Sequence, residues 1–445
     1  MGYKLKKIVL RIVIILVAVI ALGLIIRAVF NYSSGKRLES YVEQMKAEGI
    51  PLSLKEAEPE CAPQNNAALD WKKAEVFLSI EREQRKMLGK TIDGLFYDKP
   101  IEKNAREQIQ DLRNKNQEAL NLILEASSKS CFKYWETWDV FLSDSDMPKV
   151  SQLIQGFRLI GIDAVLKAEE GQIEEAIDQC LKARRFLKLY LQEPFLINYL
   201  IDMALIKINA VCFNTIVSNQ NLETEILEKI LLEWEASPWK EGLVRALELE
   251  KTSMIEAILF YLSGELDLDP DQVIAGDFYY WLFRPVLKNE IIYMIETWDE
   301  LIEVVKMPYF ASRNGQKIEK IIKEIPWYYK LARMRIPNFW SALLKKATLD
   351  ALVETARIGI ACKIFKNLYG DFPEILDELS PGILAEIPLD PFTGKPYIYK
   401  KDDTGFIVYS VGSNLKDEGG RGTWAITQLV MEKDDDWAWK TKTQK

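Results

Sequence analysis

The chain contains no histidine, so any chemistry would fall to carboxylates, lysines, tyrosines and five cysteines. Ser-His-Asp and Cys-His nucleophilic systems are excluded in their usual form, as are the common His-containing zinc sites. Glu169 with Glu170, or Glu248 with Glu250, could supply the paired carboxylates of a glycan hydrolase or lyase. Residues one or two positions apart do not share a helix face, however, so solvating carboxylates are the simpler interpretation.

An acidic residue occupies every second position from Glu265 to Asp271, as in a calcium-binding loop. The glycine required at the sixth position is missing, and the twelfth position is Phe278 rather than Glu. We therefore interpret this stretch as a solvated acidic turn.

The five cysteines are widely spaced and form no Cys-x-x-Cys pair. Cys180, Cys212 and Cys362 fall within apolar helical patterns, which predicts small buried side chains. Cys61 and Cys131 lie in less regular stretches and could pair in an oxidising compartment, but the sequence leaves that open.

Length and composition describe a folded protein of ordinary globular type. The 445 residues suggest two or three domains, with 48% hydrophobic and 28% charged residues. A formal net charge of −8 argues against a nucleic-acid partner, because phosphate binding needs a basic field.

Residues 8–30 are almost continuously apolar and would form a helix about 34 Å long, enough to cross a bilayer. The basic residues before or at the start of this span slightly outweigh those after it (Lys4, Lys6, Lys7 and Arg11 against Arg27, Lys36 and Arg37). This bias predicts a cytoplasmic segment 1–7 and an extracytoplasmic remainder, in a single-pass membrane protein. A cleaved signal peptide is the alternative, although no Ala-x-Ala site follows the span.

The stretch after the span is expected to hold a short amphipathic helix and a proline-rich connector, over 31–64, and then a helical domain over 65–340. The helices predicted there cover 65–85, 103–127, 149–170, 172–191, 195–217, 223–235, 240–263, 279–305 and 316–333. Gly171 to Ala183 resembles the second helix of a tetratricopeptide unit, but no second copy follows. An irregular, weakly tetratricopeptide-like helical array is therefore predicted. The aromatic and basic run from Ile325 to Trp340 could either touch lipid headgroups or pack between helices.

A different pattern begins after residue 340, and it predicts a small α+β module over 341–445. A long helix over 342–368 precedes strands over 397–400 and 406–411, which are joined by a tight turn from Asp402 to Gly405. A glycine-rich loop over 412–420 and an acidic tail over 434–436 follow.

The order of these motifs resembles the globular end of the major pseudopilin of type II secretion systems. The matching steps are Tyr369 to Pro373, Ile387 to Tyr397 and Tyr409 to Gly420. Two features depart from that family: the N-terminal span lacks an acidic residue, and a large helical domain separates it from the module. An ordinary pilin subunit is therefore not expected.

The pseudopilin resemblance implies a calcium site in the final loop. Its oxygen ligands would come from Asn414, Asp417 and one or more of Asp434, Asp435 and Asp436. A solvated acidic loop and tail is the alternative.

The whole arrangement is similar to uncharacterised envelope proteins of planctomycetes and their relatives. The expected function is that of a non-enzymatic scaffold, anchored in the bacterial inner membrane through residues 8–30, that contacts other envelope proteins. The one cofactor expected is the calcium that the pseudopilin resemblance implies. An assembly factor for a secretion apparatus shares this evidence, and a carboxylate-dependent hydrolase or lyase acting on the cell wall is the enzymatic alternative.

Overall fold

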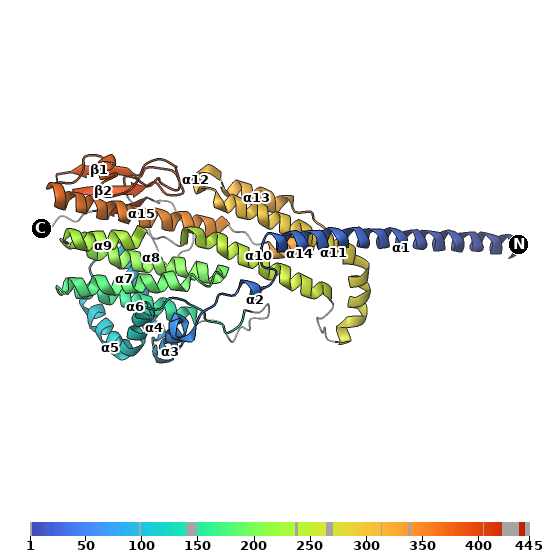
Figure 1. Ribbon diagram of the computed structural model, residues 1–445, viewed down its shortest axis with the longest axis horizontal. Helices are drawn as coiled ribbons and strands as arrows, with labels where there is room; N and C mark the ends of the chain where they lie inside the picture. The colour runs from blue at the N-terminus through green and yellow to red at the C-terminus, as the bar shows by residue number, and fades with distance from the viewer. Residues whose placement is uncertain are drawn as a thin grey trace.

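The computed structural model is mostly helical, with one long helix projecting from one end and a small sheet at the other (Figure 1). The structure describes residues 2–97, 99–138, 149–235, 239–263, 270–312, 314–336, 340–403, 405–420 and 436–440. The acidic stretch that begins at Glu265 lies mainly outside these ranges, so its predicted turn is not described.

Helix α1 (Gly2–Ala47) is continuous from the apolar span into the helical domain. The large apolar side chains from Ile8 to Phe30 are about half or more exposed, and the helix is long and apolar enough to cross a membrane. Beyond them, Leu38 and Met45 are buried, where α1 packs on α11 (Pro270–Lys306). The short amphipathic helix expected after the span is thus the C-terminal part of the same helix.

Helices that lie side by side form the helical domain (Figure 1). Helix α8 is apolar enough to resemble a second membrane span, but it is largely buried and serves as the core against which α4, α6, α7 and α10 pack. The elements are α2 (Leu54–Ala57), η1 (Pro63–Asn65), α3 (Ala67–Phe77), α4 (Arg82–Phe96), α5 (Lys103–Ala126), α6 (Val150–Glu169), α7 (Ile173–Tyr190), α8 (Leu196–Asn219), α9 (Thr224–Glu235) and α10 (Trp239–Ser263).

The single helix predicted over 65–85 is wrong, because the chain breaks between α3 and α4. Asn116 of α5 accepts a hydrogen bond from the Ser79 amide at 2.7 Å and donates one to the Ser79 carbonyl at 3.3 Å. Glu81 then begins α4 through a capping box with Gln84. The buried amide of a distant helix satisfies the backbone groups that the break exposes.

Helices α12 (Tyr309–Ser312), α13 (Asn314–Glu324) and α14 (Lys330–Arg335) follow α11. The helix predicted over 316–333 is divided between α13 and α14 near Pro326, whose ring cannot continue a helix. Helix α11 also contains a proline, Pro285, and changes direction in that region (Figure 1).

The C-terminal module consists of α15 (Trp340–Tyr369), η3 (Leu376–Leu379) and an antiparallel sheet in the order β1-β2-β3. Strands β1 (Ile398–Asp402) and β2 (Gly405–Ser410) form the predicted hairpin, and β3 (Trp437–Lys440) adds an unpredicted third strand. A Cβ on Gly359 of α15 would lie 2.4 Å from the Trp439 ring, so glycine permits the sheet to sit directly on the helix. Helix α15 also packs on α8 and α9, which joins the module to the helical domain.

Candidate functional site

A groove of about 790 Å³ lies between the helical domain and the C-terminal module. Its lining comes from α10, the end of α11, α12, the turn over residues 386–391 and α15, and we call the α15 part the floor. Two parts of the chain build it, because α15 and the turn belong to the C-terminal module, whereas α10, α11 and α12 belong to the helical domain. A junction of this kind is a usual place for a binding site.

The floor of the groove carries two carboxylates one helical turn apart, Asp350 and Glu354. Asp350 accepts a hydrogen bond from the Trp239 indole at 3.0 Å and pairs with Lys346 at 3.0 Å. Glu354 pairs with Lys240 at 2.8 Å and with Arg357 at 2.7 Å. All four carboxylate oxygens are therefore engaged, which suits a structural role better than general acid–base chemistry.

Part of the rim of the groove is apolar. Met307 and Phe310 are each 41% exposed, and Leu389, which also lines the groove, is 52% exposed. Phe310 also lies over Gly394, where an added Cβ would come within 2.6 Å of the ring. Exposed apolar side chains beside a concave surface are typical of protein-contact sites.

Beside this rim, Tyr309 joins α12 to the module. Its ring stacks on Trp340 with centroids 5.4 Å apart and meets the edge of Phe392 at 5.3 Å. Burial raises the pKa of Tyr309 to about 12, so the hydroxyl stays neutral at physiological pH. These contacts hold α12 against the C-terminal module beside the groove.

A second polar cluster lies behind the floor, in the core. The Arg184 guanidinium sits between the Trp234 and Trp239 rings, 4.3 and 4.9 Å from their centroids. Burial lowers the pKa of Arg184 to about 9 and raises that of the nearby Asp202 well above its ordinary range. Within the described part of the chain, the Arg184 Nη atoms and both Asp202 oxygens have no hydrogen-bond partner. Trp239 touches both this cluster and the groove floor, so the two are in direct contact.

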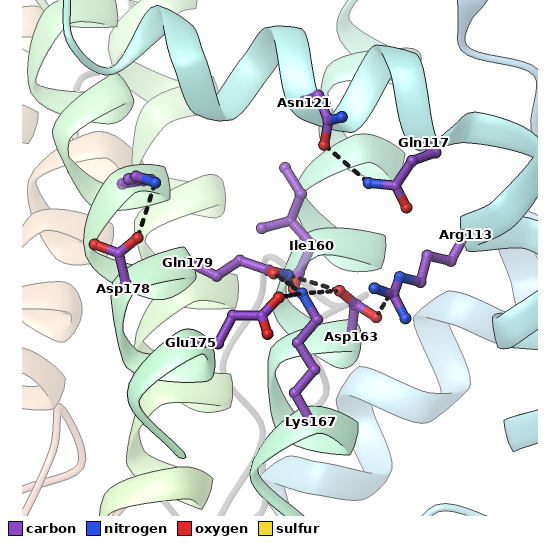
Figure 2. Close-up of polar contacts among 10 residues, drawn as sticks. Arg113, Gln117, Asn121, Ile160, Asp163, Lys167, Glu175, Asp178 and Gln179 are labelled. Atoms are coloured by element: carbon purple, nitrogen blue, oxygen red, sulfur yellow. Dashed lines mark hydrogen bonds and ion pairs between the residues drawn. The ribbon is translucent and has the colours of Figure 1, made fainter. Parts of the chain in front are cut away.

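A third polar cluster connects α5, α6 and α7 where the tetratricopeptide resemblance was noted (Figure 2). Asp163 meets Arg113 at 3.1 Å and Lys167 at 3.3 Å, and Gln179 donates to it at 3.0 Å. Lys167 also reaches Glu175 at 2.6 Å. Each buried charge here has a partner, so we assign the cluster to helix packing.

The paired carboxylates considered from sequence do not form an acid–base pair in the structure. Glu169 pairs with Arg106 at the surface, and Glu170 is exposed. Glu248 lines the groove, whereas Glu250 accepts a hydrogen bond from the Leu196 amide at 3.3 Å. The two members of the second pair thus have different surroundings, as their spacing predicts.

The cysteine arrangement answers the question that the sequence left open. Cys61 and Cys131 form a disulfide, with Cα atoms 5.8 Å apart. Asn66 reinforces the link, because its amide bonds to the backbone of Lys133 at 2.7 and 2.9 Å. The other three, Cys180, Cys212 and Cys362, are free and buried, as predicted.

The predicted calcium ligands are only partly within the described residues, since Asp434 and Asp435 lie outside them. Asp417 accepts hydrogen bonds from the Tyr409 hydroxyl and the Gly419 amide, both at 2.8 Å, and the second bond holds its pKa below the usual range. Asn414 donates to Glu418 at 2.9 Å.

Asp436, the third described member of this set, lies next to Glu418, the residue to which Asn414 donates. It accepts from the Gly420 amide at 2.7 Å and borders a smaller hollow of about 320 Å³. Burial, with Glu418 adding to it, raises the pKa of Asp436 to about 6. Its Oδ1 atom is buried without a hydrogen-bond partner in the described residues, as a cation ligand would be. No group of three acidic or cysteine side chains suited to a metal is found among the described residues, so calcium binding stays a prediction.

The sequence did not predict the groove. Its floor residues belong to ordinary amphipathic helix patterns, and the turn at Leu389 gives no local sign of what it faces. Comparison of the chain with family models, with curated proteins and with solved structures gave no match in any of the three. The resemblances to pseudopilins and to planctomycete envelope proteins therefore stay predictions from the sequence.

Proposed function

We propose that this chain is a membrane-anchored scaffold of the bacterial envelope, which holds a partner protein in the groove between its helical domain and its C-terminal module. The observation that carries the proposal is the apolar rim of Met307, Phe310 and Leu389 around an ion-paired floor. Apolar side chains at a rim gain free energy when a partner protein buries them. The carboxylates of the floor are already ion-paired, which makes them poorly suited to acid–base catalysis.

The proposed placement follows from two other features. Residues 8–30 of α1 would cross the inner membrane with segment 1–7 in the cytoplasm, and the rest would lie outside it. The Cys61–Cys131 disulfide supports that side, because disulfides persist in oxidising compartments. The partner we propose is an envelope protein, such as a component of a pilus-like or type II secretion system, in keeping with the resemblance of the module.

The groove can be tested by site-specific photocrosslinking in intact cells. A photoreactive phenylalanine analogue at Leu389 or Met307 should give discrete crosslinked adducts with one partner. The matched control is Leu232 on α9, which is 71% exposed but lies outside the groove. Adducts at Leu232 alone, or none at either groove position, would refute the proposal.

The alternative function, a carboxylate-dependent hydrolase or lyase acting on a cell-wall glycan, is favoured by one observation. Asp350 and Glu354 lie one turn apart in a concave site, and most glycoside hydrolases act through a pair of carboxyl groups. Purified chain would then release reducing ends from cell-wall glycan, and Glu354→Gln would abolish that release. Their ion pairs make the scaffold the better-supported function.

A further inference from the structure

Three large apolar side chains face solvent near the end of the helical domain from which α1 projects. Trp327 is 77% exposed, Tyr328 52% and Met334 70%. They lie in α14 and in the segment that leads into it, together with the exposed basic residues Lys330 and Arg333. Apolar and basic side chains in one exposed segment are typical of a surface that meets lipid headgroups.

The position of this segment relative to α1 is fixed through α11. Lys288 of α11 donates to the Asn31 side chain of α1 at 3.1 Å, and Asn289 donates to Ser34. Further along, Arg37 pairs with Glu296 at 3.0 Å. The two helices therefore run in the same direction away from the apolar span.

Helix α11 in turn holds the exposed segment. Glu290 accepts a hydrogen bond from the Ala332 amide at 3.0 Å, and the Tyr293 ring packs on Tyr329 with centroids 5.1 Å apart. These contacts place the segment beside the part of α1 between Ser34 and Arg37. At 1.5 Å per residue, that part lies about 6 to 10 Å beyond Phe30, where the apolar span ends.

This distance matches the outer part of a bilayer. The headgroup region extends roughly 5 to 8 Å beyond the hydrocarbon on each side, and a tryptophan side chain can cover the remaining gap. The backbone of α11 before Pro285 crosses the direction of α1 at the same end of the domain (Figure 1).

We propose that Trp327, Tyr328 and Met334 insert into the headgroup layer of the membrane that α1 crosses, with Lys330 and Arg333 facing lipid phosphates. This second contact would fix the tilt of the domain over the membrane. The inference rests on the proposed anchoring by α1, and the following experiment separates the failure of one from the failure of the other.

The test uses the full chain in nanodiscs of phosphatidylethanolamine and phosphatidylglycerol, with a spin label on one introduced cysteine. The variants are Trp327→Cys, Met334→Cys, Leu16→Cys in the apolar span and Leu232→Cys on α9. The three native free thiols are buried, so labelling favours the introduced one. Collision with oxygen, which enters lipid, is compared with collision with a water-soluble nickel complex.

We expect the labels at 327 and 334 to lose nickel-complex accessibility relative to the label at 232, and to lie shallower than the label at 16. Apart from their scaffold-protein belt, the nanodiscs contain no other protein and no envelope component, so such a loss assigns the contact to the disc's lipid. If the label at 16 lies in the bilayer but the labels at 327 and 334 are as accessible to the nickel complex as the label at 232, the inference is overturned while the anchor stands. If the label at 16 is also accessible to the nickel complex, the proposed membrane anchor itself fails. A loss that occurs only after envelope proteins are added would also overturn the inference, because the segment would then be a protein-binding surface.

Discussion

Replacing Asp163 by asparagine should destabilise the protein far more than the same change at Asp178. Both are aspartates paired with a lysine one turn later, so the chemistry and spacing match (Figure 2). They differ in burial: the Asp163–Lys167 side chains are 7% and 8% exposed, whereas Asp178 and Lys182 are each 45% exposed.

The expected magnitudes follow from this difference. At the 3.1 Å between Asp163 and Arg113, the Coulomb energy at an effective dielectric constant of 20 is about 5 kcal/mol, most of which offsets desolvation. Removing one partner leaves the other charges buried and less well paired, which costs about 3–5 kcal/mol. The exposed pair on α7 contributes about 0.3–0.5 kcal/mol.

The assay is denaturant unfolding of the full chain in detergent, followed by intrinsic tryptophan fluorescence. Asp163→Asn should lower the free energy of unfolding by about 3 kcal/mol or more, and Asp178→Asn by less than about 0.5 kcal/mol. In a Lys167→Met background the cost of Asp163→Asn should shrink, because the two charges are coupled. Equal losses for the two aspartates would refute the reasoning that burial sets the effect.

Three further predictions concern the disulfide, a buried glutamate and calcium. Thiol titration of the denatured, unreduced chain should find three free thiols, and five after reduction; five at the outset would contradict the Cys61–Cys131 pairing. Burial raises the pKa of Glu193 from 4.5 to about 7, so its contribution to stability is full below pH 4.5 and is lost as pH rises through 7. Glu193→Gln should therefore remove up to about 3 kcal/mol of pH dependence from the unfolding free energy, and an unchanged pH profile would count against it. Millimolar calcium should raise the melting temperature of the full chain relative to chelator, by an amount that Asp417→Asn and Asp436→Asn reduce; identical melting curves would leave the final loop as a solvated one.

The helix predictions succeeded where the signals were local. Apolar periodicity and the left-handed Gly171, with φ of +87°, place the end of α6 and the start of α7 close to where the sequence puts them. The hairpin of β1 and β2 could also be predicted from the sequence, because its turn is stabilised locally. Asp402 accepts a hydrogen bond from the Gly405 amide at 2.9 Å within the turn itself.

The predictions failed where the determining partner lies far along the chain. The break between α3 and α4 depends on Asn116, and β3 depends on pairing with β2 and on Trp439 fitting over Gly359. The groove is harder still, since its walls come from α10, α12, α15 and a turn near Leu389. Periodicity identifies which face of a helix is buried but not which helix covers it.

The unbroken path of α1 has a mechanical consequence. A flexible tether would let the domain sweep a hemisphere above its anchor, but a helix without a hinge transmits its own tilt to everything attached to it. If residues 8–30 lie in a bilayer, the groove stays at one height and partners must reach it by diffusing in the plane. Inserting a proline after Phe30 would break the helix and introduce a hinge between the apolar span and the domain, without altering any contact in the groove.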